Sequence, residues 1–417
     1  MQFICDFHLH SKYSRATARD ADIENFAKWA KIKGIDVLGT GDFTHPLWLK
    51  ELQEKLEPAE EGLFKLKSSN QIRFILTAEI SSIYSKAGKV RKIHNIIFAP
   101  SFDVVEKINT HLGWIGNLKS DGRPILGLDA KELAKIVLNI SPDCLIVPAH
   151  AWTPWFSIFG SFSGFDSIEE CFEEYAKEIY AIETGLSSSP EMNWRWSKLD
   201  KITLISNSDA HSPSKIGREA NIFEGEKISY NLIKDAIKRR GDLKLVKTIE
   251  FFPEEGKYHW DGHRNCEIVL NPEESLKYNN LCPRCGKLLT IGVMNRVCQL
   301  ADRKIPTEVG KRIPFERLIP LEEIIADVLG MGTGTKAVQE HYKNLVRVFG
   351  NEFKVLREIK KQEISSLSTP EIAEGIERVK QGKVSIRPGY DGEYGKISIF
   401  KDDEERPKMR GEQETLF

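Results

Sequence analysis

The chain has 417 residues, of which 41% are hydrophobic and 29% charged, and its formal net charge at pH 7 is -1. These values are ordinary for a globular protein of two or three domains, and they exclude attraction to nucleic acid through overall charge. The sequence has no apolar run of the roughly 20 residues needed to cross a bilayer and no signal sequence at its amino end. We therefore expect a cytoplasmic protein without a membrane partner.

The amino-terminal half alternates apolar runs with helical patterns, such as those at 22–33 and 130–138. Strands that alternate with helices predict an α/β fold with a parallel sheet or barrel, and function at the carboxyl ends of the strands. Four of the apolar runs in this half end in a residue of a type that binds metals. These ligands are Asp42, Glu79, His150 and Glu183, whereas His94 stands early in its run.

Two pairs of metal-type ligands begin and end this half. His8 and His10 lie two residues apart, as do Asp209 and His211. Residues two apart on a strand point to the same side, so each pair can face one cation. Of the ten histidines in the chain, His8, His10, His45, His94, His150 and His211 all lie in this half. Mixed imidazole and carboxylate ligands predict a centre of two or three divalent metals (Zn, Mn, Mg or Fe) that hydrolyses a phosphoester.

The motifs that carry these ligands resemble those of the PHP (polymerase and histidinol phosphatase) superfamily. They are His8-Leu9-His10, Thr40 to His45, Thr77-Ala-Glu79, Lys92-Ile-His94, Pro148-Ala-His150 and Ser208-Asp-Ala-His211. The resemblance implies a distorted (β/α) barrel with metal ligands at His8, His10, Glu79, His94, His150, Asp209 and His211, among which Asp209, Glu79 and His211 act in catalysis. Phe43 stands where the family has a histidine, so either Asp42 or His45 replaces it, and position favours Asp42. Glu183 lies where many relatives have a polar residue.

Four cysteines cluster after residue 260, and the pair Cys282 and Cys285 has the C-x2-C spacing of a zinc ribbon. Such a knuckle holds one side of a tetrahedral zinc ion, and a second pair of ligands completes it. His263 with Cys266 is one candidate for that pair, and the family resemblance favours it. Cys266 with Cys298 is the other, and His259 is a third option. We expect a structural zinc, because a segment of about fifty residues buries little apolar area.

These sites divide the chain into four parts. We expect residues 1–247 to form the metal-dependent phosphoesterase domain, 248–304 a small zinc-binding domain, 305–400 a mainly helical DNA-binding domain, and 401–417 a charged flexible tail. Helical spacing predicts helices at 321–329, 337–349 and 352–359, and residues 384–400 have turn and strand character.

Three groups of residues are candidates for contact with DNA. The loop after His150 is rich in aromatic side chains that could stack on an extruded base, and these include Trp152, Trp155 and Phe159. Arg15, Arg19 and Arg218 are candidate phosphate clamps. The segment with Thr335, Lys336, Lys343 and Arg347 offers backbone amides and positive charge to the phosphate backbone.

The barrel motifs, the 258–266 and 282–302 segments and Arg387 to Gly395 together resemble the PHP-superfamily DNA repair endonucleases that act on deaminated bases. The resemblance implies flipping of uracil, hypoxanthine, xanthine or an abasic site out of double-stranded DNA, and hydrolysis of the phosphodiester on its 5′ side. Three alternatives share some of these features. They are a small-molecule phosphatase of the histidinol-phosphatase type, a 3′ exonuclease and a non-catalytic DNA-binding protein.

The last five residues, Gln413 to Phe417, resemble the first half of a sliding-clamp binding box. They suggest a sliding clamp as a partner.

Overall fold

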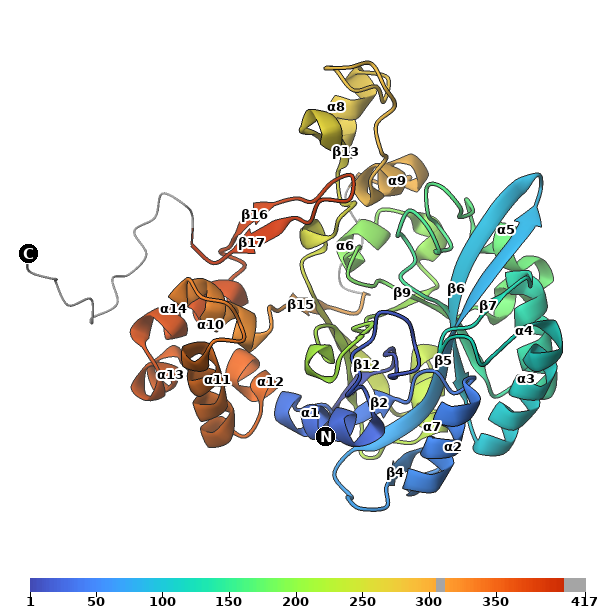
Figure 1. The fold of residues 1–417 in the computed structure, drawn as a ribbon, viewed down its shortest axis with the longest axis horizontal. Helices are drawn as coiled ribbons and strands as arrows, with labels where there is room; N and C mark the ends of the chain where they lie inside the picture. The colour runs from blue at the N-terminus through green and yellow to red at the C-terminus, as the bar shows by residue number, and fades with distance from the viewer. Residues whose placement is uncertain (305–311, 401–417) are drawn as a thin grey trace, which may run out of the picture.

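The structure is a computed structural model, and it describes residues 1–304 and 312–400. Figure 1 shows a strand-rich body, a small module above it and a group of helices at one side. The segment Gln413 to Phe417 and the rest of the tail lie outside the described residues. Within the described ranges, no helix is both long and apolar enough to span a bilayer.

The body is built on an 11-stranded mixed sheet that curls into a distorted barrel. The strands β1 (Gln2–Asp6), β2 (Val37–Gly39) and β5 (Arg73–Lys86) pair in parallel. Strand β6 (Lys89–Ala99) pairs antiparallel with both β5 and β8 (Leu145–Pro148), so β8 runs in the same direction as β5. The antiparallel strands β11 (Ala220–Glu224) and β12 (Lys244–Glu250) extend the sheet beyond β1. Short strands β3 (Leu56–Pro58), β4 (Phe64–Leu66) and β7 (Ile125–Leu126) pair at its margins. The expected parallel sheet is therefore only partly correct.

A separate parallel pair, β9 (Ala181–Glu183) and β10 (Thr203–Ile205), closes the barrel between β8 and β11. The Ala151 amide donates to the Glu183 carbonyl at 3.0 Å on one side. On the other side the Asn221 side chain joins β11 to β10, because it donates to the Ser206 carbonyl and accepts from the Ser206 amide. A side chain thus replaces part of a strand ladder, which is why the barrel is distorted.

Aromatic side chains fill the barrel interior. Phe7 packs against Phe98 and Phe223, with ring centroids 5.4 and 6.0 Å apart. Helix α7 (Tyr230–Ile237) adds its buried face to the same cluster, and the Tyr230 hydroxyl donates to the Phe98 carbonyl at 3.2 Å. Apolar side chains therefore fill the barrel interior next to α7, and the candidate metal ligands do not belong to this cluster.

The outer helices agree with the helical patterns of the sequence. Helix α1 (Ile23–Lys33) begins at the N-cap Asp22, whose carboxylate accepts from the Asn25 amide, and it ends at Gly34, whose φ of 90° favours glycine. Helices α2 (Pro46–Lys55), α3 (Phe102–Ile115) and α4 (Ala130–Ile140) cover the sheet, as Figure 1 shows for the last two. The predicted helices at 22–33 and 130–138 are confirmed.

Five helices form the side group: α10 (Leu321–Leu329), α11 (Lys336–Phe349), α12 (Glu352–Arg357), α13 (Lys361–Leu367) and α14 (Pro370–Lys380). The first three were predicted, and the last two were not. Strand β15 (Phe315–Arg317) precedes them and pairs in parallel with β12, so part of the expected helical domain extends the sheet of the body.

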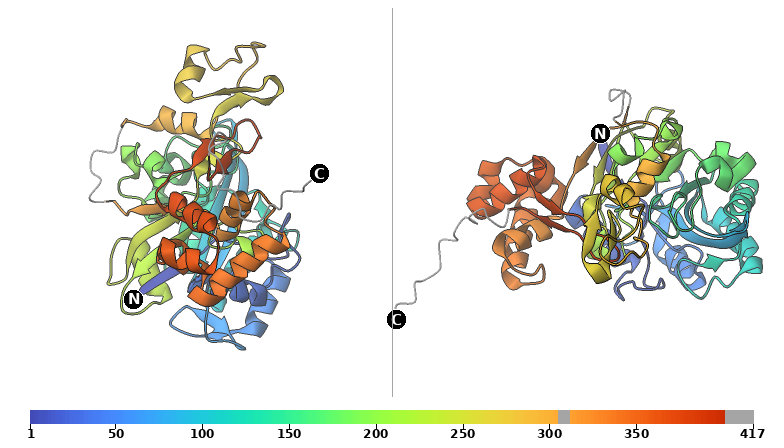
Figure 2. Two further views of the ribbon diagram at one scale, coloured as in Figure 1. Left: turned by 90° about the vertical axis from the view of Figure 1, so that its left-hand side faces the viewer. Right: turned by 90° about the horizontal axis from the view of Figure 1, so that it is seen from above.

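The small module contains the hairpin of β13 (Asp261–His263) and β14 (Ile268–Leu270), followed by α8 (Pro272–Lys277) and α9 (Val293–Leu300). After the side helices the chain returns to it as a second hairpin, β16 (Ser385–Arg387) and β17 (Lys396–Ser398). The Trp260 amide donates to the Gly389 carbonyl at 3.0 Å, so this hairpin is attached to the module. Figures 1 and 2 show it between the side helices and the module.

Candidate metal centre and the adjoining cavity

The two ligand pairs of the sequence lie side by side at one end of the barrel. Leu9 forms a parallel bridge with Ala210, and the His10 amide donates to the Ala210 carbonyl at 2.9 Å. This bridge places Asp209 beside the imidazoles of His8 and His10. The three side chains form a group whose ligand atoms all lie within 4.8 Å of one another.

Glu79, His94 and His150 form a second group of the same size. The Glu79 Oε1 atom lies 2.8 Å from His94 Nδ1 and 3.0 Å from His150 Nε2. Its other oxygen, Oε2, lies 3.3 Å from His10 Nε2 and 3.7 Å from His8 Nε2. One buried carboxylate thus faces both groups, which is the arrangement of a bridging ligand between two cations.

Strand direction explains the positions of Glu79 and His94 within their strands. The expectation that the apolar run ends at Glu79 is wrong, because β5 continues to Lys86. Its hairpin partner β6 runs antiparallel and pairs His94 with Ser81, and Ile96 with Glu79. His94 and Glu79 are therefore diagonal neighbours on the same face. A ligand early in an antiparallel strand lies at the same end of the barrel as ligands late in parallel strands.

The residues of both groups suit divalent cations. His8 Nε2, His10 Nε2 and Asp209 Oδ1 are buried and have no hydrogen-bond partner, which is rare for buried polar atoms unless an ion or water satisfies them. Burial lowers the pKa of His94 to about 4 despite the nearby Glu79, so its imidazole is neutral and can act as a ligand. Burial opposes the charge of Glu79, but His94, Arg123 and His8 outweigh it and hold its pKa well below the ordinary value.

Asp42 and Glu183 lie behind the ligands and orient them. The Asp42 Oδ1 atom is 3.0 Å from His10 Nδ1, and its other oxygen accepts from the Ser11 amide at 2.7 Å. The Glu183 oxygens are 3.0 and 3.1 Å from His8 Nδ1. Each carboxylate therefore leaves the Nε2 atom of its histidine for a cation, as outer-sphere carboxylates do in metal sites.

His45 and His211 are outside both groups. His45 precedes α2, its ring stacks on Tyr13 at 4.4 Å, and its Nδ1 has no hydrogen-bond partner. His211 lies beside the first group, with its ring 4.6 Å from that of His10 and its Nδ1 2.8 Å from the Asp209 backbone carbonyl. Of the two replacements considered for the missing family histidine, Asp42 is the one that contacts a ligand.

Arg123 is a charged neighbour that the sequence did not indicate. Its guanidinium lies 3.1 Å from Glu79 Oε2, at the junction of the two groups. It follows a turn at Asp121 and Gly122, where no periodic pattern or motif distinguishes it from surface arginines. Its position makes it a better candidate phosphate ligand than the three arginines chosen from the sequence.

A cavity of about 580 Å³ adjoins the second group, within the range of pockets for small ligands. His94, His150 and Asp209 contribute to its lining, together with a largely apolar wall that includes Trp155 and Phe156. Trp155 stacks on Phe162 with a ring separation of 4.5 Å. An aromatic group could therefore enter within reach of the ligand groups.

Trp152 and Phe159 do not lie where the sequence predicted. Both are fully buried, and the Trp152 indole donates to the Asn193 side chain at 2.7 Å. Their rings pack against each other and against Trp196. These two side chains form a small core under the loop, and they cannot stack on a base in this conformation.

The predicted phosphate clamps differ in their surroundings. Arg15 lines the cavity and is 76% exposed, with its Nε atom 3.3 Å from Asp121. Arg19 is exposed. Arg218 donates to Glu323 of α10 and packs on the Phe251 ring, so its charge is used in holding the side helices to the body.

Thr335, Lys336, Lys343 and Arg347 are all exposed at the start and along one face of α11. Lys336 lies 3.7 Å from Glu340 in an exposed pair. This cationic face is open to solvent.

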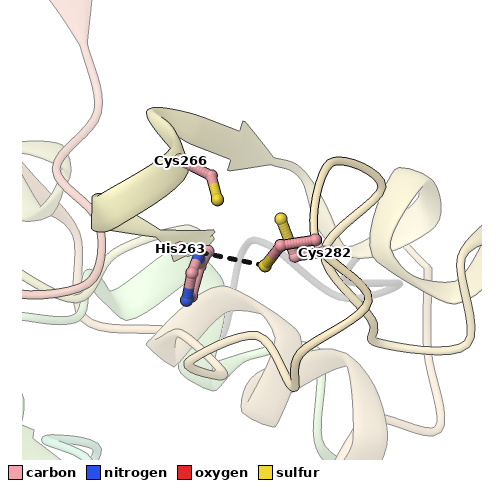
Figure 3. A group of neighbouring side chains, drawn as sticks. His263, Cys266 and Cys282 are labelled. Carbon is pink, nitrogen blue, oxygen red and sulfur yellow. Dashed lines mark hydrogen bonds between the residues drawn. The ribbon is translucent and has the colours of Figure 1, made fainter.

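The zinc ligands favoured from the sequence come together. The ligand atoms of His263, Cys266, Cys282 and Cys285 all lie within 4.8 Å of one another. Figure 3 shows the labelled side chains pointing toward a common point. Cys298 lies elsewhere and accepts from Arg195 at 3.4 Å, and His259 lines the cavity beside the metal groups. Three cysteines and a histidine in this compact arrangement fit a closed structural zinc site.

Comparisons with known proteins identify one family model and two similar sequences. A family model described as the MJ0043 C-terminal domain matches residues 320–383, which span α10 to α14. Protein MJ0043 of Methanocaldococcus jannaschii is 39% identical over 60% of this chain, and the chain spans only 31% of its length. Protein YqxK of Bacillus subtilis is 28% identical over 88% of this chain and 89% of its own.

Two solved structures are similar over almost the whole chain. The lesion-specific endonuclease PfuEndoQ from Pyrococcus furiosus is 34% identical, with a TM-score of 0.85 over 95% of both chains. An endonuclease Q in complex with a 27-mer duplex that carries an abasic lesion at the active site is 33% identical. Its TM-score is 0.85 over 96% of this chain and 97% of that chain.

The barrel, its ligand groups and these similarities define a metal-dependent DNA endonuclease of DNA repair. The chain belongs to the endonuclease Q family.

Proposed function

We propose that the enzyme cleaves double-stranded DNA on the 5′ side of uracil, hypoxanthine, xanthine or an abasic site. The observation that carries this proposal is the buried Glu79 carboxylate, which faces both ligand groups at the edge of a 580 Å³ cavity. A phosphodiester beside Glu79 would have its base within reach of that cavity. The abasic lesion at the active site of a relative of similar length supports the placement of a lesion beside the ligand groups.

In this proposal His8, His10 and Asp209 would hold one divalent cation, and Glu79, His94 and His150 would hold a second. When bound, such cations activate water for in-line attack and stabilise charge on the phosphoryl and leaving oxygens. Asp42 and Glu183 keep the Nε2 atoms of His10 and His8 aimed at the site. Arg123 turns from Glu79 toward a non-bridging phosphate oxygen when substrate enters.

The cavity receives the extruded base. Trp155 and Phe156 provide its aromatic wall, and stacking on such a wall is worth about 1–3 kcal/mol per base. Residues 1–247 carry the catalytic centre, 248–304 the structural zinc, and 305–400 the cationic face with Lys336, Lys343 and Arg347. That face contacts the phosphate backbone, so binding weakens as salt increases.

A direct test uses a labelled duplex with one central uracil, hypoxanthine or abasic site. After chelation and addition of Mn²⁺, Mg²⁺ or Zn²⁺ in turn, we expect one incision immediately 5′ to the lesion and none in an undamaged duplex. Asp209→Asn should abolish incision while the duplex still binds. Digestion from free ends, or faster turnover of a free phosphomonoester, would replace this proposal with an exonuclease or a phosphatase.

The proposed partnership with a sliding clamp through Gln413 to Phe417 has its own test. A pull-down of the clamp with the full chain and with the chain lacking its last ten residues should recover clamp only with the former. Equal recovery would exclude this segment as the contact.

A further inference from the structure

A second hollow adjoins the candidate metal centre. It is an open groove of about 660 Å³, and its lining includes His211 and Tyr394. Leu186 and Asp209 line both this groove and the cavity described above. The two hollows therefore meet beside the first ligand group, and a ligand that occupies the cavity can continue into the groove.

Tyr394 gives the groove an exposed aromatic wall. This residue belongs to the hairpin of β16 and β17, and it is 69% exposed. The Lys257 ammonium lies 4.4 Å from the centre of the Tyr394 ring, and Lys257 also lines the cavity. Large aromatic side chains contribute most when they are covered, and an exposed one beside a binding site indicates a surface that a partner covers.

The hairpin that carries Tyr394 is firmly attached to the chain before the zinc module. The Gly389 amide donates to the Glu254 carbonyl at 2.8 Å, and the Gly395 amide donates to the Glu255 carbonyl at 2.9 Å. A Cβ added to Gly395 would lie 2.2 Å from the Glu254 carbonyl oxygen, so the two segments are in close contact. The backbone around Tyr394 is therefore ordered before a ligand arrives, and binding orders little further.

The direction of the DNA strand indicates what fills the groove. In the proposed function the lesion base enters the cavity, and the phosphate on its 5′ side lies at the metal ligands. The nucleotide beyond that phosphate is the 5′ neighbour of the lesion. Because the lesion base already occupies the cavity, this neighbour continues into the hollow that adjoins it at Asp209.

We propose that the groove binds the nucleotide on the 5′ side of the scissile phosphate, and that Tyr394 stacks on the base of that nucleotide. This inference rests on the proposed function above. Every base has a π-face, so such a contact accepts any neighbouring sequence. No atom of the lesion takes part in it, and its contribution is therefore the same for uracil, hypoxanthine and an abasic site.

The kinetic test compares Tyr394→Ala with Tyr394→Phe, which keeps the ring. We expect kcat/KM of Tyr394→Ala to fall roughly 5- to 100-fold on all three lesions, the range that base–aromatic stacking contributes. Tyr394→Phe should stay within about twofold of wild type, because it loses only an exposed hydroxyl. Wild-type activity of Tyr394→Ala, a loss confined to one lesion, or an equal loss in Tyr394→Phe would overturn the proposal.

A fluorescent base locates the contact. 2-Aminopurine is dim when it is stacked and bright when it is not, and Asp209→Asn provides a background that binds the duplex without cutting it. With 2-aminopurine on the 5′ side of a uracil, the complex should be brighter when Tyr394→Ala is added to this background. With 2-aminopurine on the 3′ side, the added substitution should change nothing.

The outcomes separate this inference from the proposed function. Equal brightness with and without Tyr394→Ala at the 5′ position, or a change at the 3′ position alone, would refute stacking on the 5′ neighbour. Incision by wild type on the 3′ side of the lesion would instead refute the proposed function.

Discussion

At the scale of residues, the site depends on groups that would be unfavourable elsewhere. Glu79 is a fully buried carboxylate, and Asp42, His150 and Asp209 have backbone φ angles of 48°, 30° and 48°. Such left-handed conformations cost on the order of 1–3 kcal/mol each for residues other than glycine, and they persist where the surrounding structure enforces them. Here they turn the chain beside a strand end or bridge, which places His150 and Asp209 among the ligands and Asp42 behind His10.

A second buried carboxylate makes the stability of the protein depend on pH. Burial raises the pKa of Glu250 from 4.5 to about 8, although Thr248, Thr184 and Ser206 act in the opposite direction through hydrogen bonds. The protonated form is therefore favoured in the folded state. Its contribution to stability is complete below pH 4.5 and is lost as the pH rises through 8.

We expect the free energy of unfolding of wild type to fall by on the order of 4 kcal/mol between pH 5 and pH 9 relative to Glu250→Gln. The Gln variant has no proton to lose, so its profile lacks this decline. Urea unfolding at a series of pH values measures the difference. Parallel profiles would show that Glu250 does not titrate in this range.

The identity of the candidate ligands could be predicted from the sequence, but which of them face a cation and which orient another ligand could not. His8, His10 and Asp209 stand out because their spacing suits one face of a strand. Whether Asp42 binds a cation or orients His10 depends on which ring nitrogen it faces, and only the fold decides that. Aromatic residues in one loop look alike in sequence, so the full burial of Trp152 and the half-buried position of Trp155 could not be distinguished.

At the scale of elements, helices were more predictable than strand directions. The apolar spacing of α1, α4 and α10 is strong, whereas α13 and α14 are separated by a short break near Pro370 that resembles a loop. The alternation of strands and helices did not reveal that β5 continues past Glu79 and turns back as β6. That hairpin brings His94 into the site from an antiparallel strand.

A buried ion pair attaches the side helices to the body. Lys33 of α1 lies 2.8 Å from Glu352 of α12, and both side chains are 4% exposed. The Glu352 carboxylate also accepts from the Tyr342 hydroxyl at 2.6 Å and the Leu321 amide at 3.0 Å. Removal of one member leaves the other charge buried without a partner.

Glu352→Ala should therefore lower the free energy of unfolding by about 3–5 kcal/mol. The exposed pair of Lys336 and Glu340 provides the matched control, and Lys336→Ala should cost less than about 1 kcal/mol. Chemical denaturation of both variants makes the comparison. Similar small losses in the two variants would mean that the contact between α1 and α12 does not stabilise the fold.

At the scale of the whole molecule, the small module that carries the candidate zinc ligands also lines part of the cavity. Arg296 of α9 donates to the Phe159 carbonyl at 2.9 Å and to the Phe165 carbonyl at 3.1 Å, which joins the module to the aromatic loop. Tyr258 and Val293 contribute to the cavity lining. The metal groups and the cavity wall therefore come from segments far apart in the chain.

Cys282→Ser should remove one zinc per chain and increase proteolysis within residues 257–304, because the module buries little apolar area without its metal. Cleavage beside a uracil should fall as the cavity wall loosens. Elemental analysis, limited proteolysis and the incision assay test these effects together. A variant with wild-type zinc content and wild-type proteolysis would show that Cys282 is not a ligand.

The most direct measurement of the central claim is an anomalous difference map from crystals of the enzyme grown with Mn²⁺. We predict one peak among His8, His10 and Asp209 and another beside His94 and His150, with Glu79 between them. A map without density at these positions, from an enzyme that still cleaves DNA in Mn²⁺, would contradict the assignment of this site.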